Sequence, residues 1–194
     1  MKKLTREDLF SLEQYAERRT AIRAEVMAHK QNRRISLGDH VRLLFEDRVT
    51  IQYQVQEMLR AERIFEVAGI EEELAAYNPL IPDGDNLKAT MLIEYEDVNE
   101  RQQALARLRG IEDRVWVQIA DQRAYAIADE DLERENDTKT SSVHFMRFQF
   151  DDKAGVRLRA GAPLSFGVDH DVYSATTVAT EAQRESLAAD FGAD

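Results

Sequence analysis

Apolar residues recur at helical spacing between residues 48 and 65, in the stretch RVTIQYQVQEMLRAERIF. At about 3.6 residues per turn, one side of the predicted helix carries Ile51, Val55, Met58 and Phe65. Glu62 projects into the middle of that apolar side. Because a buried carboxylate without a partner costs several kcal/mol, we expect Glu62 to meet an opposite charge, a hydrogen-bond network, a metal or a functional pocket.

The opposite side of the same helix is apolar too, although more weakly. It carries Val49, Tyr53, Ile64 and Val67, with Arg60 near its centre. Both sides are therefore expected to be covered by other parts of the chain. Arg60, like Glu62, then needs a partner of opposite charge or a polar network.

The N-terminal half is predicted to be helical around one hairpin. Helices are expected over residues 6–16, 21–30, 49–67 and 71–77, the third ending at Gly69 as its C-cap. The stretch RISLGDHVRLLFED alternates around Gly38 and Asp39, which predicts a hairpin with strands over 35–37 and 41–45.

Alternation with a period of two residues dominates after the loop NPLIPDGDN. Strands are predicted over 88–95, 142–150 and 163–170, with a hairpin over 114–129 and helices over 98–110 and 151–161. This order is close to a ferredoxin-like split β-α-β arrangement with one additional strand. The predicted fold class is α+β, in which a helical N-terminal half with a hairpin packs on a mainly antiparallel sheet.

The pattern divides the chain into three parts. Residues 1–86 form a helical subdomain with the hairpin, and residues 87–173 form the sheet subdomain. Residues 174–194 contain few large apolar side chains, so we expect them to be a mobile tail.

The charge balance narrows the range of partners. The chain of 194 residues has 26 basic and 37 acidic side chains, a net charge of −11, which repels nucleic acid and anionic lipid. No apolar run approaches the roughly 18 residues of a membrane span, and the start MKKLTREDLF lacks the apolar core of a signal peptide. We therefore expect a cytoplasmic protein that binds neither nucleic acid nor membrane, and a homo-oligomer is compatible with the pattern.

Cysteine is absent from the sequence. This excludes disulfides, thiolate chemistry and cysteine-ligated iron–sulfur clusters. The nucleophile elbow, the phosphate-binding loop, the zinc motif H-E-x-x-H and the glycine-rich dinucleotide fingerprint are absent as well.

Two histidines are the candidates for a metal or acid–base site. His144 alternates with apolar residues in the predicted strand 142–150, and His170 follows Asp169 at the end of the last predicted strand. Two imidazoles and one carboxylate suit iron, zinc or manganese, so His144, His170 and Asp169 could hold a divalent ion. The alternative is a core histidine bonded to a backbone carbonyl and a second histidine in a polar loop.

Several long segments resemble a bacterial family of about this length whose function is unknown. They are NRRISLGDHVRLLFEDRVTIQYQVQEMLRAERIF, AYNPLIPDGDNLKATMLIEY, GIEDRVWVQ and SFGVDHDVY. The resemblance spans residues 3–173 and leaves the tail outside. It implies that the gene for such a protein often lies beside genes for a rubrerythrin-like protein and an iron–sulfur oxidoreductase, but it implies no catalytic residues.

Two hypotheses follow. The first, which we favour, is a non-enzymatic accessory protein that binds a redox partner, either rubrerythrin-like or an iron–sulfur oxidoreductase, and uses Arg60 and Glu62 in buried ion pairs. The second is a small metalloprotein or enzyme built on the histidine–carboxylate site. Its candidate catalytic residues are Glu57, Arg60, Glu62 and His144.

Overall fold

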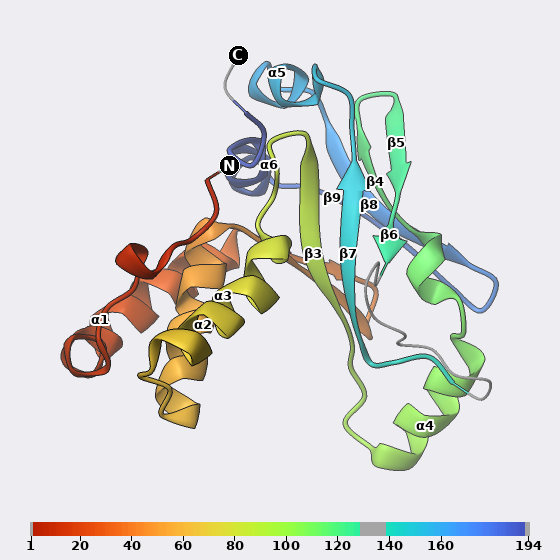
Figure 1. Cartoon of the computed structure of the whole chain (residues 1–194). Coiled ribbons are helices and arrows are strands. Elements are labelled where there is room, and N and C mark those ends of the chain that lie inside the picture. Colours follow the sequence, from red (N-terminus) through yellow and green to blue (C-terminus); the bar gives the residue numbers. More distant parts are fainter. Residues whose placement is uncertain (1, 129–138, 193–194) are drawn as a thin grey trace.

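The structure is a computed structural model that describes residues 2–128 and 139–192 (Figure 1). Its α-helices are α1 (Leu12–Gln31), α2 (Arg48–Glu62), α3 (Val67–Tyr77), α4 (Val98–Arg107), α5 (Ala154–Arg159) and α6 (Glu181–Ala188). Three short 3-10 helices are η1 (Arg6–Asp8), η2 (Asn78–Leu80) and η3 (Ile111–Arg114). The strands are β1 (Arg34–Leu37), β2 (Val41–Glu46), β3 (Asn86–Ile93), β4 (Val115–Ile119), β5 (Gln122–Tyr125), β6 (Ile127–Ala128), β7 (Val143–Gln149), β8 (Leu164–His170) and β9 (Tyr173–Val178).

The strands form two antiparallel sheets that enclose one core. Their orders are β1-β2-β3-β7-β6 and β5-β4-β8-β9. The chain bends once between β5, which pairs with β4, and β6, which pairs with β7, so this segment joins the two sheets along one side. The sheets therefore resemble a flattened barrel that is continuous along this edge.

Side chains close the opposite edge, where β9 lies beside β1. The Tyr173 hydroxyl donates to the Leu37 carbonyl at 2.6 Å and accepts from the backbone amides of His40 and Val41. The Thr177 hydroxyl donates to a second β1 carbonyl, that of Ser36, at 2.7 Å. These hydrogen bonds satisfy backbone groups at the β1 edge, so this edge strand is not left open.

Alternate residues of both sheets point into the shared core. In β2 the buried residues are Val41, Leu43 and Phe45, and β7 contributes Met146 and Phe148. The ends of the strands are covered by α4 at one end and by α5 and α6 at the other (Figure 1). The barrel interior is thus filled by the chain's own side chains.

The first three helices form a separate layer beside β3 (Figure 1). We call α1, α2 and α3 the helical layer; it has its own smaller core of Leu4, Ile51, Val55, Leu59, Leu74 and Ile81. α2 begins directly after β2, because the Asp47 side chain accepts from the Thr50 amide and caps the helix. This direct connection between β2 and α2 places the helical layer against the barrel.

The predicted α+β class with helices dominating the N-terminal half is confirmed. The finer arrangement differs from a single ferredoxin-like sheet. Both helical connections, β3-α4-β4 and β7-α5-β8, carry the chain from the first sheet to the second instead of returning it to the same sheet. The strand pairs of both sheets are antiparallel, which agrees with the predicted mainly antiparallel sheet.

Two other expectations differ from the structure. Residues 12–31 form one helix that begins at the Ser11 cap, whereas two helices were expected over 6–16 and 21–30. The C-terminal segment, expected to be a mobile tail, forms β9 and α6. Its few apolar side chains suffice, because Leu187 and Phe191 are each buried and β9 gains the backbone ladder with β8.

Among the described residues, no helix combines the length and the apolar character needed to cross a membrane.

Candidate functional site

Arg60 and Glu62 are exposed at the end of α2, so the expectation that both are covered is wrong. Glu62 does lie on the same helix side as Val55 and Leu59, but it comes after the last turn that the neighbouring helices cover. Phe65, expected on the buried side, lies beyond the helix end and is 73% exposed. The helical period predicts the side of the helix on which a residue lies, but it does not predict where the neighbouring helices that cover this side end.

Glu57, the third candidate on this helix, joins α1 to α2. Its carboxylate accepts two hydrogen bonds from Arg19, both at 2.7 Å, and one from the buried Tyr15 hydroxyl at 2.6 Å. The Arg19 hydrogen bonds hold the pKa of Glu57 down to about 2, against the opposing effect of burial. Burial and the hydrogen bond to Glu57 raise the pKa of Tyr15. This ion pair has the geometry of a helix-to-helix contact.

Acidification is expected to release α1 from α2. The pKa of Glu57 is about 2 in the folded protein against 4.5 for a free side chain, so its stabilisation is full above 4.5 and is lost as the pH falls towards 2. Glu57→Gln should mimic this loss at neutral pH and cost about 1 kcal/mol. Hydrogen exchange of the α1 amides at decreasing pH measures the effect, with Glu17→Gln on the exposed side of α1 as control. Unchanged α1 protection near pH 2 contradicts this account.

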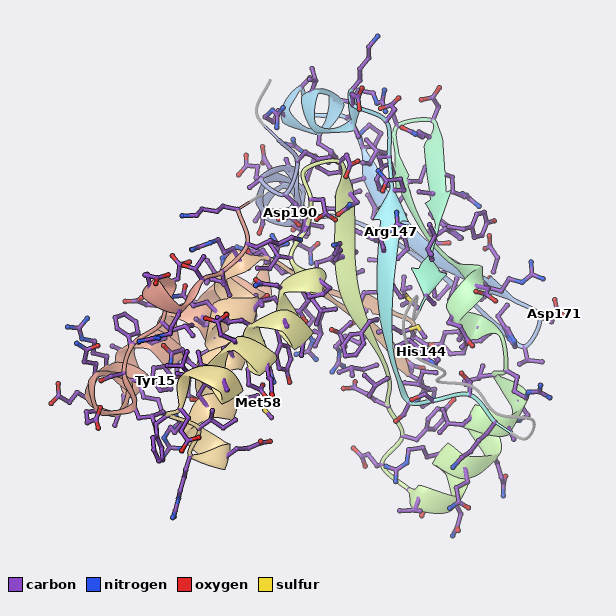
Figure 2. All side chains as sticks on the ribbon, viewed as in Figure 1. Tyr15, Met58, His144, Arg147, Asp171 and Asp190 are labelled. Carbon is purple, nitrogen blue, oxygen red and sulfur yellow. The ribbon has the colours of Figure 1, made fainter. Side chains whose placement is uncertain are left out.

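His144 points into the barrel and is fully buried. Its Nε2 lies 2.9 Å from the Thr140 hydroxyl oxygen and 3.1 Å from the Ser141 carbonyl oxygen. Thr140 also donates to Glu112 at 3.1 Å, and that carboxylate lies 3.9 Å from the imidazole. The backbone carbonyl contact is the one expected for a core histidine. Figure 2 shows His144 among the strands, far from Tyr15 in the helical layer.

The other two candidate metal ligands are engaged elsewhere. The His170 Nε2 lies 3.0 Å from the Arg109 carbonyl oxygen. Asp169, the preceding residue of β8, accepts from Arg123 at 3.2 Å and from the Tyr125 hydroxyl at 3.3 Å. The structure does not bring His144, His170 and Asp169 together, and residues 2–128 and 139–192 contain no group of three or more His, Asp or Glu side chains placed to hold a metal ion.

A buried charge cluster that was not predicted from the sequence surrounds Arg33, which is only 2% exposed. Its guanidinium donates to the carbonyls of Phe45, Glu46 and Ser186 and forms an ion pair with the buried Asp190. The available signal was the two-residue period of the strand: Arg33 directly precedes β1 and lies two positions before the buried Ile35, so it is expected on the same side. Within the basic stretch NRR, however, it resembles a solvated side chain.

Asp47 and His29 extend this cluster into the helical layer. The Asp47 Oδ2 atom lies 3.5 Å from Arg33 Nε and 2.5 Å from His29 Nε2. Burial raises the pKa of Asp190 to about 7, although the nearby Arg33 opposes this. Burial also acts to raise the pKa of Asp47. The positive charge of Arg33 and the hydrogen bond from the Thr50 amide outweigh this effect, so the pKa of Asp47 is lowered overall. One guanidinium thus serves two buried carboxylates.

A cavity of about 440 Å³ opens at the surface of the helical layer, where the start of α1 faces the turn between α2 and α3. We call it the α1–α3 groove. Its lining consists of Arg6, Leu9, Phe10, Ser11, Leu12, Glu13, Leu59, Ile64, Phe65, Val67 and Ile70. Phe65 and Val67 are 73% and 53% exposed. Contiguous exposed apolar side chains mark interaction sites more often than isolated ones do.

The fold and these sites define an acidic α+β protein with a filled barrel and an open apolar groove in its helical layer. The chain belongs to the family described as "Protein of unknown function (DUF3501)", whose model matches residues 3–191. The resemblance to a bacterial family of unknown function is thereby confirmed. Because the match reaches residue 191, the C-terminal segment belongs to the family as well, which corrects the expected limit at residue 173.

A solved structure agrees with this assignment. The chain is 52% identical to a novel protein of unknown function from Burkholderia pseudomallei, with a TM-score of 0.93. The match covers 98% of this chain and 100% of that chain. No curated protein matches.

Proposed function

We propose that the protein is a non-enzymatic accessory protein that binds a redox partner through the α1–α3 groove. The observation that carries this proposal is the exposure of Phe65 and Val67 at an open apolar cavity. Leaving a phenylalanine in water forgoes about 1.5 to 3 kcal/mol of burial energy, which a partner covering the groove recovers. A large exposed aromatic side chain is also the residue type that anchors protein interfaces.

The identity of the partner rests on the family resemblance, which implies genes for a rubrerythrin-like protein and an iron–sulfur oxidoreductase nearby. Lacking cysteine, the chain has no thiolates for an iron–sulfur cluster of its own. An accessory role beside a protein that carries the redox centre is consistent with both. The net charge of −11 would steer a basic surface of such a partner towards it.

The alternative is a metalloprotein or enzyme that uses the histidine–carboxylate site. Its strongest residue is His144, whose imidazole neighbours Thr140 and Glu112 in a buried network. Because His144 is fully buried, its imidazole does not reach the surface, where a substrate would meet it. The separate contacts of His170 and Asp169 give the metal reading no further support, so the accessory role is the better supported of the two.

Isothermal titration calorimetry tests the accessory role with the rubrerythrin-like protein and the iron–sulfur oxidoreductase purified from the same organism. We expect one of them to bind, and Phe65→Ser to weaken that binding at least tenfold, about 1.4 kcal/mol. Val98→Ser is the matched control, because Val98 is 52% exposed on α4, away from the helical layer (Figure 1). Absence of binding by both proteins, or equal binding by the Phe65→Ser variant, overturns the proposal.

A further inference from the structure

The α1–α3 groove is bordered by a strongly acidic segment. Residues 62–73, which include the end of α2 and most of α3, contain five glutamates and one arginine, a net charge of −4. Four of these glutamates, Glu62, Glu66, Glu71 and Glu72, are exposed, and Glu73 is half-buried. Val67 and Ile70 of the groove lie in the same segment. Apolar and acidic side chains therefore adjoin one another within a few turns of helix.

These carboxylates outnumber the cations of the groove region, which are Arg63 within the segment and Arg6 in the lining. None of the five glutamates has an ion-pair partner among the residues that the structure describes. Glu73 is the clearest case, because its Oε2 is buried and has no hydrogen-bond partner. Burial raises the pKa of Glu73, and the negative charges of Glu62 and Glu72 add to that effect. A cation placed here would relieve both the repulsion and the unsatisfied oxygen.

We infer that the α1–α3 groove binds a basic amphipathic helix of the partner protein. Large apolar side chains of that helix fill the cavity beside Phe65, and its lysines or arginines pair with the glutamates of residues 62–73. This inference rests on the proposed function, because it assigns the chemistry of the partner to the same groove. Amphipathic helices bind apolar grooves through side chains three and four residues apart, which matches the close spacing of apolar and acidic groups here.

Charge complementarity favours this occupant over others. A second copy of the chain also carries a net charge of −11, so two copies repel one another. Anionic lipid is repelled for the same reason. An uncharged apolar molecule could fill a cavity of about 440 Å³ but would leave the glutamates unpaired.

Two synthetic helical peptides test the inference by fluorescence anisotropy. The first has leucine and phenylalanine on one side and lysine on the other, and the second has glutamate in place of every lysine. We expect the basic peptide to bind at least tenfold more tightly, and its affinity to fall when the salt concentration rises from about 0.05 M to about 0.3 M. Phe65→Ser should weaken its binding at least tenfold as well.

The matched charge variants separate the groove from the general acidity of the protein. Glu62→Gln combined with Glu73→Gln should weaken binding of the basic peptide about tenfold. Glu96→Gln combined with Glu100→Gln removes the same charge from an exposed region at α4 and should leave the affinity unchanged. Equal losses in both double variants show nonspecific attraction and overturn the inference.

The remaining outcomes distinguish this inference from the proposed function. If the two peptides bind equally and Phe65→Ser abolishes both, the groove is a docking site but its partner is not basic, and only the inference fails. The same holds if neither peptide binds while a redox protein binds in a Phe65-dependent manner. If sedimentation shows a dimer that Phe65→Ser dissociates, a second copy occupies the groove and the inference is wrong. If the wild-type protein binds neither of the redox proteins and neither peptide, the proposed function fails as well.

Discussion

Replacing Arg33 with methionine is expected to lower the free energy of unfolding by about 3 to 5 kcal/mol, the range for breaking a buried ion pair. The substitution keeps an apolar side chain of comparable length but leaves Asp47 and Asp190 buried without their shared guanidinium. It also removes the donors for three backbone carbonyls. Urea denaturation followed by circular dichroism measures the loss. Arg34→Met is the control, because Arg34 is next to Arg33 in the chain but its side chain is exposed.

The effect of Arg33 should extend across the molecule, because the cluster joins three parts of the fold. Arg33 directly precedes β1 at the barrel edge, Asp47 caps α2 in the helical layer, and Asp190, labelled in Figure 2, follows α6. Hydrogen exchange in the Arg33→Met variant should therefore increase first in α6. Adding Asp190→Asn should restore part of the stability, since it removes the buried carboxylate whose ion pair with Arg33 is lost, whereas Asp47 keeps its contact with His29. An Arg33→Met variant within about 0.5 kcal/mol of the wild type would show that the carboxylates find other partners.

The sequence predicts best those elements whose signals are local. The hairpin of β1 and β2 combines strict alternation with Gly38, which adopts a φ of 67° in the turn. β3, α4 and β7 likewise combine clear periodicity with recognisable ends. In each case the side-chain pattern and the turn or cap residue agree, so the correct element follows without knowledge of the tertiary structure.

The parts that the sequence does not predict depend on contacts between distant segments. The alternation of β4 and β8 fits one sheet as well as two, and only the paths of α4 and α5 decide between them. The burial of Arg33 requires Asp190, which is 157 positions away in the chain. The exposure of Glu62 and Phe65 depends on where the helical layer ends. The groove was missed for the same reason, because Phe65 was assigned to a buried helix face.

Substituting Gly167 with alanine is expected to destabilise the second sheet by about 1 to 3 kcal/mol, the usual cost of overpacking. Gly167 lies directly opposite Trp116 in the ladder between β8 and β4. A Cβ atom at this position would lie 2.1 Å from Cζ2 and 2.4 Å from Cε2 of the indole. Because these are ring atoms with a backbone strand behind the new methyl group, the indole itself has to move.

Outward movement of the indole is opposed by Arg123, whose guanidinium lies 3.8 Å from the ring centroid. Arg123 is held in place by Asp169 at 3.2 Å and by Gln118 at 3.1 Å. Gly167→Ala should therefore break this stack as well as strain β8. The methyl group displaces the indole from a site where it is only 3% exposed, so water should reach the ring.

Fluorescence reports on this displacement directly, because Trp116 is the only tryptophan in the chain. We expect the emission maximum of Gly167→Ala to shift to longer wavelength and its melting temperature to fall. Ser165→Ala, on the same side of β8, is the control for a small change in this strand. Adding Trp116→Leu should reduce the cost of Gly167→Ala, since the smaller side chain leaves room for the methyl group. The expectation is contradicted if the alanine variant keeps the emission maximum and the melting temperature of the wild type. In that case β8 and β4 separate easily enough to admit the methyl group, and the close contact between the indole and Gly167 does not restrict the residue at position 167.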